Sequence, residues 1–270
     1  MEPHRSISFP EKGVGTLSFK YRERHFRVPA RGNVSVPVDA QEDWLTVSYD
    51  AGEKPEFLLA LKPDDLYALN LSNTAANDGT CKFLHRLSGL VNLNLGYSDV
   101  GDDGVKQLAA LPNLRDLDLQ ATRITDASAA TLSHLHPDRL VLSRTTITDA
   151  MVAALAHSDL KTIELTQDAI TDRTFGSLRS MSHLKKAYLE STPITDAGFR
   201  KLAGMKSLRE LDLRNDPHIT DASVSVLSTL TGLKDLDVRR SGITAAGVQR
   251  LQNALPHCRI NQKKDRPQFD

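Results

Sequence analysis

Residues 111–135 read LPNLRDLDLQATRITDASAATLSHL, and close variants of this stretch recur along most of the chain. Each variant opens with an L-x-x-L-x-L pattern, and successive variants are spaced 23–25 residues apart. Repeats of this length indicate a solenoid, because one repeat cannot bury its own leucines whereas stacked coils share a continuous core. The alignment gives three apolar columns: Leu69, Leu93, Leu117, Leu140, Ile163, Ala187, Leu211 and Leu236; Leu71, Leu95, Leu119, Leu142, Leu165, Leu189, Leu213 and Val238; and Ala76, Val100, Ile124, Ile147, Ile170, Ile194, Ile219 and Ile243.

Within each repeat the pattern predicts a short strand followed by a helix. The L-x-L alternation places leucines on one face of a strand and polar residues on the other. A small hydrogen-bonding residue follows where the chain leaves the strand, at Thr74, Ser98, Thr122, Thr145, Asp168, Thr192, Asp216 and Ser241. A Thr-Asp pair then predicts the N-cap and first turn of a helix, at Thr125-Asp126, Thr148-Asp149, Thr171-Asp172, Thr195-Asp196 and Thr220-Asp221.

The pattern L-x-x-L-x-L-x-x-T-x-I-T-D resembles leucine-rich repeats, over about residues 63–260. It is similar to the 24-residue repeats of bacterial, planctomycete-type proteins and to the repeat region of F-box substrate receptors of ubiquitin ligases. The resemblance implies an α/β fold, a right-handed leucine-rich-repeat solenoid with a curved parallel β-sheet inside and helices outside. It also implies an interaction module. We find no F-box helical segment in the chain, which argues against the ubiquitin-ligase role.

The two ends of the chain depart from the repeat. Residues 1–60 alternate in hydropathy between turn-forming stretches, which predicts four to five short antiparallel strands. We interpret 1–60 as a β-rich cap domain, 61–260 as a solenoid of about eight repeats and 261–270 as a solvated tail. An independent ligand-binding β-domain is the alternative for 1–60. Trp44, the single tryptophan, is expected in the core of the cap and not as a binding platform.

Composition excludes several function classes. Lys and Arg number 34, as do Asp and Glu, so the chain lacks the basic excess of a nucleic-acid binder. No apolar run is long enough to span a membrane, and the first residues lack the apolar core of a signal peptide. Cys81 and Cys258 lie too far apart in sequence for a disulfide framework or zinc site, so a reducing cytoplasm is expected. No catalytic or phosphate-binding motif occurs, and we expect no enzyme activity, no cofactor and no metal.

The side chains between and beside the strand leucines are expected to form the binding surface, because they face away from the core. The predicted partner-binding residues on this concave face are Asp116, Asp118, Arg139, Glu164, Lys186, Tyr188, Glu190, Glu210, Asp212, Arg214, Asp235, Asp237 and Arg239. Among them Tyr188, Arg139, Arg214 and Arg239 are of the residue types enriched in binding hot spots.

Two interpretations of the acidic residues on this face remain open. Like charges on adjacent rungs cost stability, which is typical of a surface retained for binding. Alternatively the acids are neutralised within a surface network by basic residues, namely Arg115, Lys161, Lys185, Arg209 and Lys234, together with Arg214 and Arg239.

The sequence therefore predicts a monomeric, non-enzymatic module that binds an unidentified partner protein, and neither nucleic acid nor membrane. The alternatives are a ubiquitin-ligase-like adaptor or effector, and a carbohydrate-binding or structural module. A sugar site usually needs exposed aromatic rings, for which Tyr97 and Tyr188 are nearly the only candidates on this face.

Overall fold

The computed structural model describes residues 3–262, which belong to two compact units, Met1–Pro137 and Asp138–Asp270. We call them the N-terminal unit and the C-terminal unit. Most of the tail predicted at 261–270 lies outside the described residues.

The N-terminal unit combines antiparallel strands with the first repeats. Its strands are β1 (His4–Ser8), β2 (Gly15–Tyr21), β3 (Arg24–Pro29), β4 (Asn33–Pro37), β5 (Gln41–Val47), β6 (Ala68–Asn70), β7 (Asn92–Asn94) and β8 (Asp116–Asp118). Its helices are α1 (Tyr49–Gly52), η1 (Pro55–Ala60), α2 (Asp78–Cys81), η2 (Leu84–Arg86), α3 (Asp102–Leu108), η3 (Asp126–Ser128) and α4 (Ala129–Leu135), where η marks a 3-10 helix.

One sheet runs through the N-terminal unit in the order β3-β2-β5-β6-β7-β8. Strand β2 pairs antiparallel with β3 and β5, whereas β5 to β8 pair in parallel. Strands β1 and β4 form a separate antiparallel pair. The strands predicted for 1–60 are therefore present, and through β5 they continue the sheet of the first repeats.

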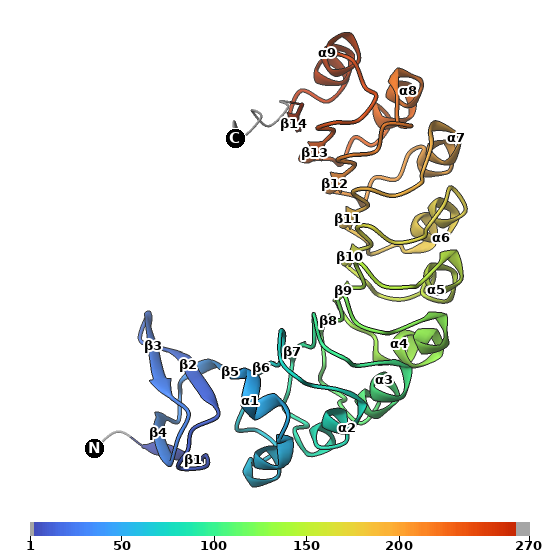
Figure 1. The fold of residues 1–270 in the computed structure, drawn as a ribbon. Helices are drawn as coiled ribbons and strands as arrows, with labels where there is room; N and C mark the ends of the chain where they lie inside the picture. The colour runs from blue at the N-terminus through green and yellow to red at the C-terminus, as the bar shows by residue number, and fades with distance from the viewer. Residues whose placement is uncertain (1–2, 263–270) are drawn as a thin grey trace, which may run out of the picture. The chain divides into compact units, whose positions relative to one another are not determined.

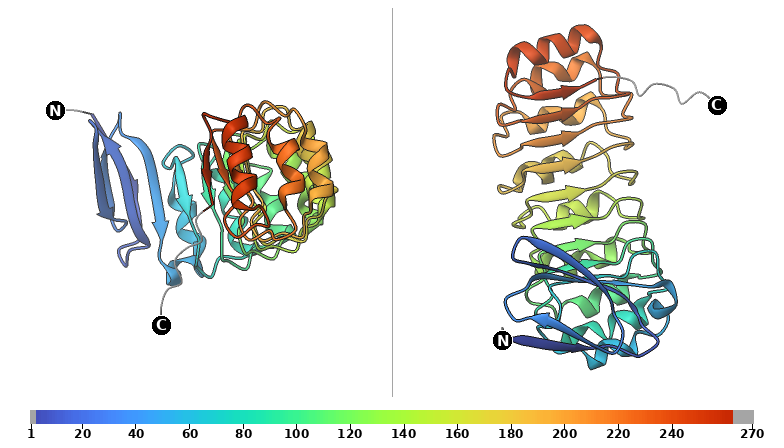
Figure 2. Two further views of the ribbon diagram at one scale, coloured as in Figure 1. Left: turned by 90° about the horizontal axis from the view of Figure 1, so that it is seen from above. Right: turned by 90° about the vertical axis from the view of Figure 1, so that its left-hand side faces the viewer.

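The C-terminal unit repeats one strand–helix coil. Its strands are β9 (Arg139–Val141), β10 (Thr162–Glu164), β11 (Lys186–Tyr188), β12 (Glu210–Asp212), β13 (Asp235–Asp237) and β14 (Arg259–Asn261). Its helices are α5 (Asp149–Ala154), α6 (Thr174–Ser180), α7 (Asp196–Phe199), η4 (Arg200–Leu202), η5 (Asp221–Ser223), α8 (Val224–Leu227) and α9 (Ala245–Ala254). Strands β9 to β14 pair in parallel and in order. Within this unit the strands line one side and the helices the other (Figures 1 and 2).

The three predicted apolar columns form the core of both units. Every residue in them is at most 6% exposed, and all but a few are fully buried. Strand pairing keeps the first column in register, as in Ile163 opposite Ala187 and Leu211 opposite Leu236. The prediction of a leucine-rich-repeat solenoid with strands and helices on opposite sides is confirmed. The outer elements are shorter than the pattern suggests, and several are 3-10 helices.

The Thr-Asp pair has a second role that periodicity alone does not reveal. Four of the five threonines cap their own helix as predicted; the hydroxyl of Thr195, for example, accepts a hydrogen bond from the backbone N–H of Ala197. The prediction is wrong for Thr171, because α6 begins only at Thr174 and its N-cap is Arg173. The adjacent aspartate reaches the next coil, where Asp196 accepts from the backbone N–H of Thr220 at 2.8 Å and from its hydroxyl at 2.6 Å. The same bridge recurs from Asp102, Asp149, Asp172 and Asp221 to Thr125, Thr171, Thr195 and Thr244. These aspartates join consecutive coils outside the apolar core.

We expect Asp196→Ala to lower the free energy of unfolding by about 2 kcal/mol at pH 7, because it leaves three donors of the next coil unpaired. Burial raises the pKa of Asp196, but hydrogen bonds from Ser223 and Thr220 outweigh it and hold the pKa below the usual value. The bridge therefore stabilises the fold above the ordinary carboxyl pKa of about 4 and is lost as the pH falls through the lower folded value. Urea unfolding at pH 7 and pH 2.5 measures both effects.

The matched control for this bridge is Asp159→Ala, because Asp159 is 70% exposed and lies 3.7 Å from an exposed histidine, His183. Its cost should stay within about 0.5 kcal/mol at either pH. Equal costs for the two variants would show that the inter-coil bridge does not stabilise the fold.

Candidate functional site

The strands of the C-terminal unit present three columns of side chains, polar except for Val141, on the face opposite the core. The first column follows the register Thr162, Lys186, Glu210, Asp235 and Arg259. The second follows Val141, Glu164, Tyr188, Asp212, Asp237 and Asn261. The third comes directly after the strands and contains Ser143, Thr166, Glu190, Arg214 and Arg239. We call these side chains, together with Arg139, the C-terminal strand face.

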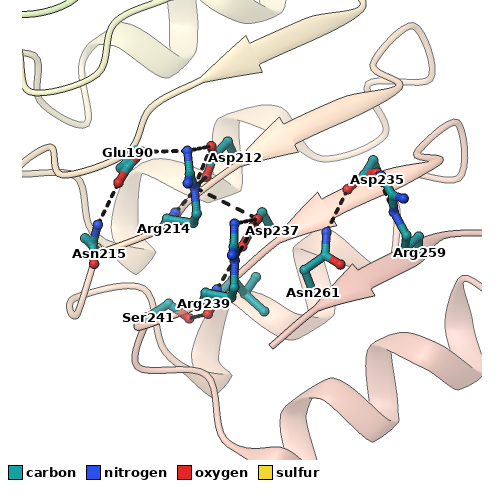
Figure 3. Close-up of polar contacts among 11 residues, drawn as sticks. Glu190, Asp212, Arg214, Asn215, Asp235, Asp237, Arg239, Ser241, Arg259 and Asn261 are labelled. Atoms are coloured by element: carbon teal, nitrogen blue, oxygen red, sulfur yellow. Dashed lines mark hydrogen bonds and ion pairs between the residues drawn. The ribbon is translucent and has the colours of Figure 1, made fainter. Parts of the chain in front are cut away.

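Arg214 connects three acids of this face (Figure 3). Its guanidinium lies 2.6 Å from Glu190, 2.8 Å from Asp212 and 3.9 Å from Asp237. The like charges of Asp212 and Asp237 stand side by side in the register, as predicted. Arg214 bonds to both of them, so their repulsion is offset on this face.

Two further arginines pair with the acids at the end of the sheet. Arg239 lies 2.7 Å from Asp237, and Arg259 bonds to Asp235, which also accepts from Asn261 at 3.1 Å (Figure 3). Arg259 comes from β14, a strand that the partner-binding prediction did not include. In the sequence, only the position of Arg259, one repeat after Asp235, could have assigned it to this face.

Tyr188 belongs to a second cluster at the middle of the face. Its hydroxyl donates to Glu210 at 2.8 Å, and Glu210 also pairs with Lys186 at 2.9 Å. Burial and the bond to Glu210 raise the pKa of Tyr188, so it is a neutral donor at physiological pH. Burial raises the pKa of Glu210, but the hydrogen bonds from Lys186 and Tyr188 outweigh burial and hold the pKa below its usual value. Glu210 is therefore ionised. Nearby, Arg139 pairs with Glu164 at 2.7 Å.

Several acids of the face also have a backbone role. The carboxylate of Asp212 accepts from the N–H of Arg214 at 3.0 Å, and that of Asp237 accepts from the N–H of Arg239 at 3.1 Å. Such short-range bonds satisfy the backbone where the chain turns away from the strand. The acids at these positions are thus explained in part by local structure and not by binding alone.

The structure favours the neutralised network over unpaired acids, and Arg214 and Arg239 take part in it as expected. Lys161 pairs with Asp138, and Arg209 donates to backbone carbonyls of Lys206 and Leu208. Most of the neutralising charge comes from within the face, at Lys186, Arg214, Arg239 and Arg259. The prediction that the basic residues preceding the strands do this is wrong for Lys161 and Arg209.

Two of the predicted binding residues, Asp116 and Asp118, belong to the N-terminal unit. They pair in register with Asn92 and Asn94 of β7, and Asp118 accepts from the N–H of Gln120 at 2.9 Å. The structure therefore brings together Arg139, Glu164, Lys186, Tyr188, Glu190, Glu210, Asp212, Arg214, Asp235, Asp237 and Arg239 on one unit.

The C-terminal strand face encloses only a shallow hollow, of about 320 Å³, lined by both acids and bases. Among residues 3–262 no group of three or more His, Cys, Asp or Glu side chains is placed to hold a metal ion. No helix in the described part of the chain is long and apolar enough to cross a membrane. The C-terminal strand face therefore presents a row of charged and hydrogen-bonding side chains, held in place by their ion pairs, that is suited to contact with another molecule.

Comparison with known proteins gives the same fold. A family model described as Leucine Rich repeat matches residues 90–109. The crystal structure of internalin C2 from Listeria monocytogenes is similar, with a TM-score of 0.57 and 21% identity over 76% of this chain and 84% of that one. No curated protein sequence matches. The repeat pattern, the stacked strand–helix coils and these similarities show that the chain is a leucine-rich repeat protein.

Proposed function

We propose that this protein is a non-enzymatic interaction module that binds a partner protein on the C-terminal strand face. The observation that carries the proposal is the ordered row of paired side chains on that face, where ion pairs of 2.6–2.9 Å fix Lys186, Arg214 and Arg239. Pre-organised side chains lose less entropy on binding, which favours affinity.

The charges on this face specify the partner's surface. Because the face carries both signs, with Lys186 beside Glu210 but also Asp212 beside Asp237, the partner should present both signs in a matching order, with a groove for Tyr188. Tyrosine and arginine near the middle of an interface carry a large share of binding energy. A partner that was simply basic would meet Arg214 and Arg239 and be repelled.

Two other functions were open from the sequence. A ubiquitin-ligase-like adaptor would need an F-box helical segment, and residues 3–60 hold five strands with only the short helices α1 and η1. A carbohydrate-binding role would use Tyr188, whose ring is half-buried with its hydroxyl engaged by Glu210. We propose the cytoplasm as the location, because Cys81 and Cys258 are both free and buried.

We expect the double variant Tyr188→Ala/Arg239→Ala to lose at least tenfold in partner recovery, as removal of two hot-spot side chains costs more than about 1.4 kcal/mol. The measurement is affinity capture from native lysate with the immobilised full chain, followed by quantitative mass spectrometry. Alanine at these two positions is preferable to changes at Asp212 or Asp237, because those carboxylates also hold backbone N–H groups.

The matched control is Arg200→Ala/Lys206→Ala, which removes two exposed side chains from the helix side of the same unit. Thermal melts should show that both variants stay folded. Proteins lost only with the strand-face variant are the partners. Identical recoveries from the two variants, or binding to a glycan array in place of protein capture, would contradict the proposal.

A further inference from the structure

The single tryptophan lies on the solvent-facing side of the N-terminal sheet and not in a cap core. Register places Trp44 of β5 beside Ser18 of β2, and Ser18 beside Arg27 of β3. Leu17 and Leu45, on the opposite face of the same strands, are fully buried. The expectation of a core tryptophan is therefore wrong: strand alternation gives the core positions to its neighbours, and Trp44 stays partly exposed on the other face.

Basic side chains surround this tryptophan. Lys20 and His25 form the next pair along β2 and β3, on the same face as Ser18 and Arg27. We call Ser18, Lys20, His25, Arg27 and Trp44 the Trp44 surface. It borders a hollow of about 470 Å³, also lined by Phe19, Phe26, Thr46 and Asn70. No carboxylate is among these lining residues of the described chain, and the volume is in the range of ligand-binding pockets.

Part of the positive charge here, that of Arg27 and His25, has no acidic partner among the described residues, in contrast to the C-terminal strand face. Lys20 pairs at 3.0 Å with Glu23, whose side chain is 89% exposed. Arg27 and His25 are exposed, and neither has a carboxylate partner within the described residues. In a chain whose formal net charge is zero, such a local excess indicates an anionic partner.

Strand β3 also ends its sheet, so it has one edge without a neighbouring strand among the described residues. All its residues except Val28 are exposed. An exposed edge accepts an extended peptide through backbone hydrogen bonds, while neighbouring side chains select its sequence. Charged residues on an edge strand also discourage self-association, which would explain the arginines of β3. It does not explain the partly exposed indole of Trp44 on the same face.

We propose that the Trp44 surface binds an acidic, extended segment of a partner protein. The segment's carboxylates pair with Arg27 and Lys20, and an aromatic side chain from the segment packs against Trp44 in the hollow. A protein is favoured over nucleic acid because the basic patch is small and the chain is neutral as a whole. This inference goes beyond the proposed function, since it concerns another surface on the other unit.

Fluorescence of the full chain tests this, because Trp44 is its only indole. The probe is the peptide Glu-Asp-Phe-Asp-Glu, titrated beside Lys-Arg-Phe-Arg-Lys and a single-stranded dT oligonucleotide. We expect saturable change in emission with the acidic peptide alone, and weaker binding at higher salt. No saturable response to the acidic peptide, or tighter binding of the oligonucleotide, would overturn the proposal.

Variants localise the site, with calorimetry as a readout independent of fluorescence. Arg27→Glu should weaken the acidic peptide at least tenfold, and Trp44→Ala should weaken it measurably. The control Lys12→Glu makes the same charge change at an exposed position of the same unit, outside this surface, and should leave affinity unchanged. Equal affinities for Arg27→Glu and the wild type would refute the site.

The two proposals fail separately. The double variant Tyr188→Ala/Arg239→Ala should bind the acidic peptide normally, because its substitutions lie on the C-terminal strand face. Loss of peptide binding in that variant, with the fold intact, would assign the peptide to the C-terminal strand face and reject the Trp44 surface as its site.

Discussion

Replacing Phe175 with alanine is expected to lower the free energy of unfolding of the C-terminal unit by about 4 kcal/mol, the usual cost of truncating a buried aromatic residue. Phe175 is fully buried on α6, and its ring centroid lies 4.7 Å from that of Phe199 on α7. The space left behind cannot be refilled without moving two helices. Urea unfolding followed by circular dichroism measures the loss.

The chain offers a matched control in Phe26, which is 38% exposed and stacks on Phe19 at the surface of the N-terminal unit. Phe26→Ala should cost clearly less, about 1 kcal/mol, since more than a third of this residue already contacts water. A cost for Phe175→Ala as small as that of Phe26→Ala would mean that the coils are not held together by their apolar contacts.

Glycine explains why this ring fits between two coils. A Cβ on Gly198 of α7 would lie 2.4 Å from Cδ2 of Phe175 and 2.6 Å from the carboxylate of Asp172. Gly104 and Gly247 occupy the corresponding position in other coils, where a Cβ would meet Asp78 and Asp221. Glycine at this position lets the preceding coil's side chain approach the helix backbone.

The periodic features of the fold could be predicted from the sequence because the same residue pattern occurs in every repeat. Leucine columns, capping threonines and outward strand positions are all visible in an alignment of the chain with itself. An alignment does not show whether a side chain forms its hydrogen bonds within its own coil or with the next coil. The bond from Asp196 to Thr220, in the next coil, therefore escaped prediction, although both residues had been assigned to helix starts.

Backbone conformation was the second feature beyond reach. In each of the eight repeats the third residue after the end of the strand is left-handed although it is not glycine, as at Ala121 with φ 52° and Arg144 with φ 61°. Rules that look for glycine at such positions find nothing there. In the same turn the carboxylate of Asp212 accepts a hydrogen bond from the backbone N–H of Arg214. The sequence does not reveal this bond, so Asp212 is interpreted there only as a surface charge.

The candidate site was predictable in its location but not in its pairing. Arg139, Tyr188 and Arg214 were assigned to the outward face by strand alternation alone, and the structure places them there. Their partners depend on side-chain reach across rungs, which spacing does not determine. Trp44 was misassigned because residues 1–60 do not repeat and so offer no second copy of the pattern.

Two buried aspartates should make the C-terminal unit more stable in mild acid than at pH 8. Asp168 and Asp216 stand where most repeats have Thr or Ser, and they are 3% and 0% exposed. Each accepts a bond of 2.8 Å, from the backbone N–H of Thr145 and of Thr192 respectively, while its second oxygen has no partner among the described residues. Burial raises the pKa of each carboxyl to about 7.

The sign of the effect follows from these values. A carboxyl with a pKa of about 4 in the unfolded chain and about 7 in the folded one favours folding fully below pH 4. That contribution is lost progressively as the pH rises to about 7, because the folded state must then hold a buried, half-satisfied charge. Asparagine keeps the accepting oxygen but does not ionise.

We therefore expect Asp168→Asn and Asp216→Asn each to raise the free energy of unfolding by about 2 kcal/mol at pH 8 and to change it little at pH 4. Urea unfolding at the two pH values gives the difference directly. The exposed Asp159→Asn serves as control and should show no effect at either pH. A gain from the buried substitutions that is equal at pH 4 and pH 8 would show that folding does not raise the pKa of these carboxyls, since only a shifted pKa makes their contribution to stability depend on pH.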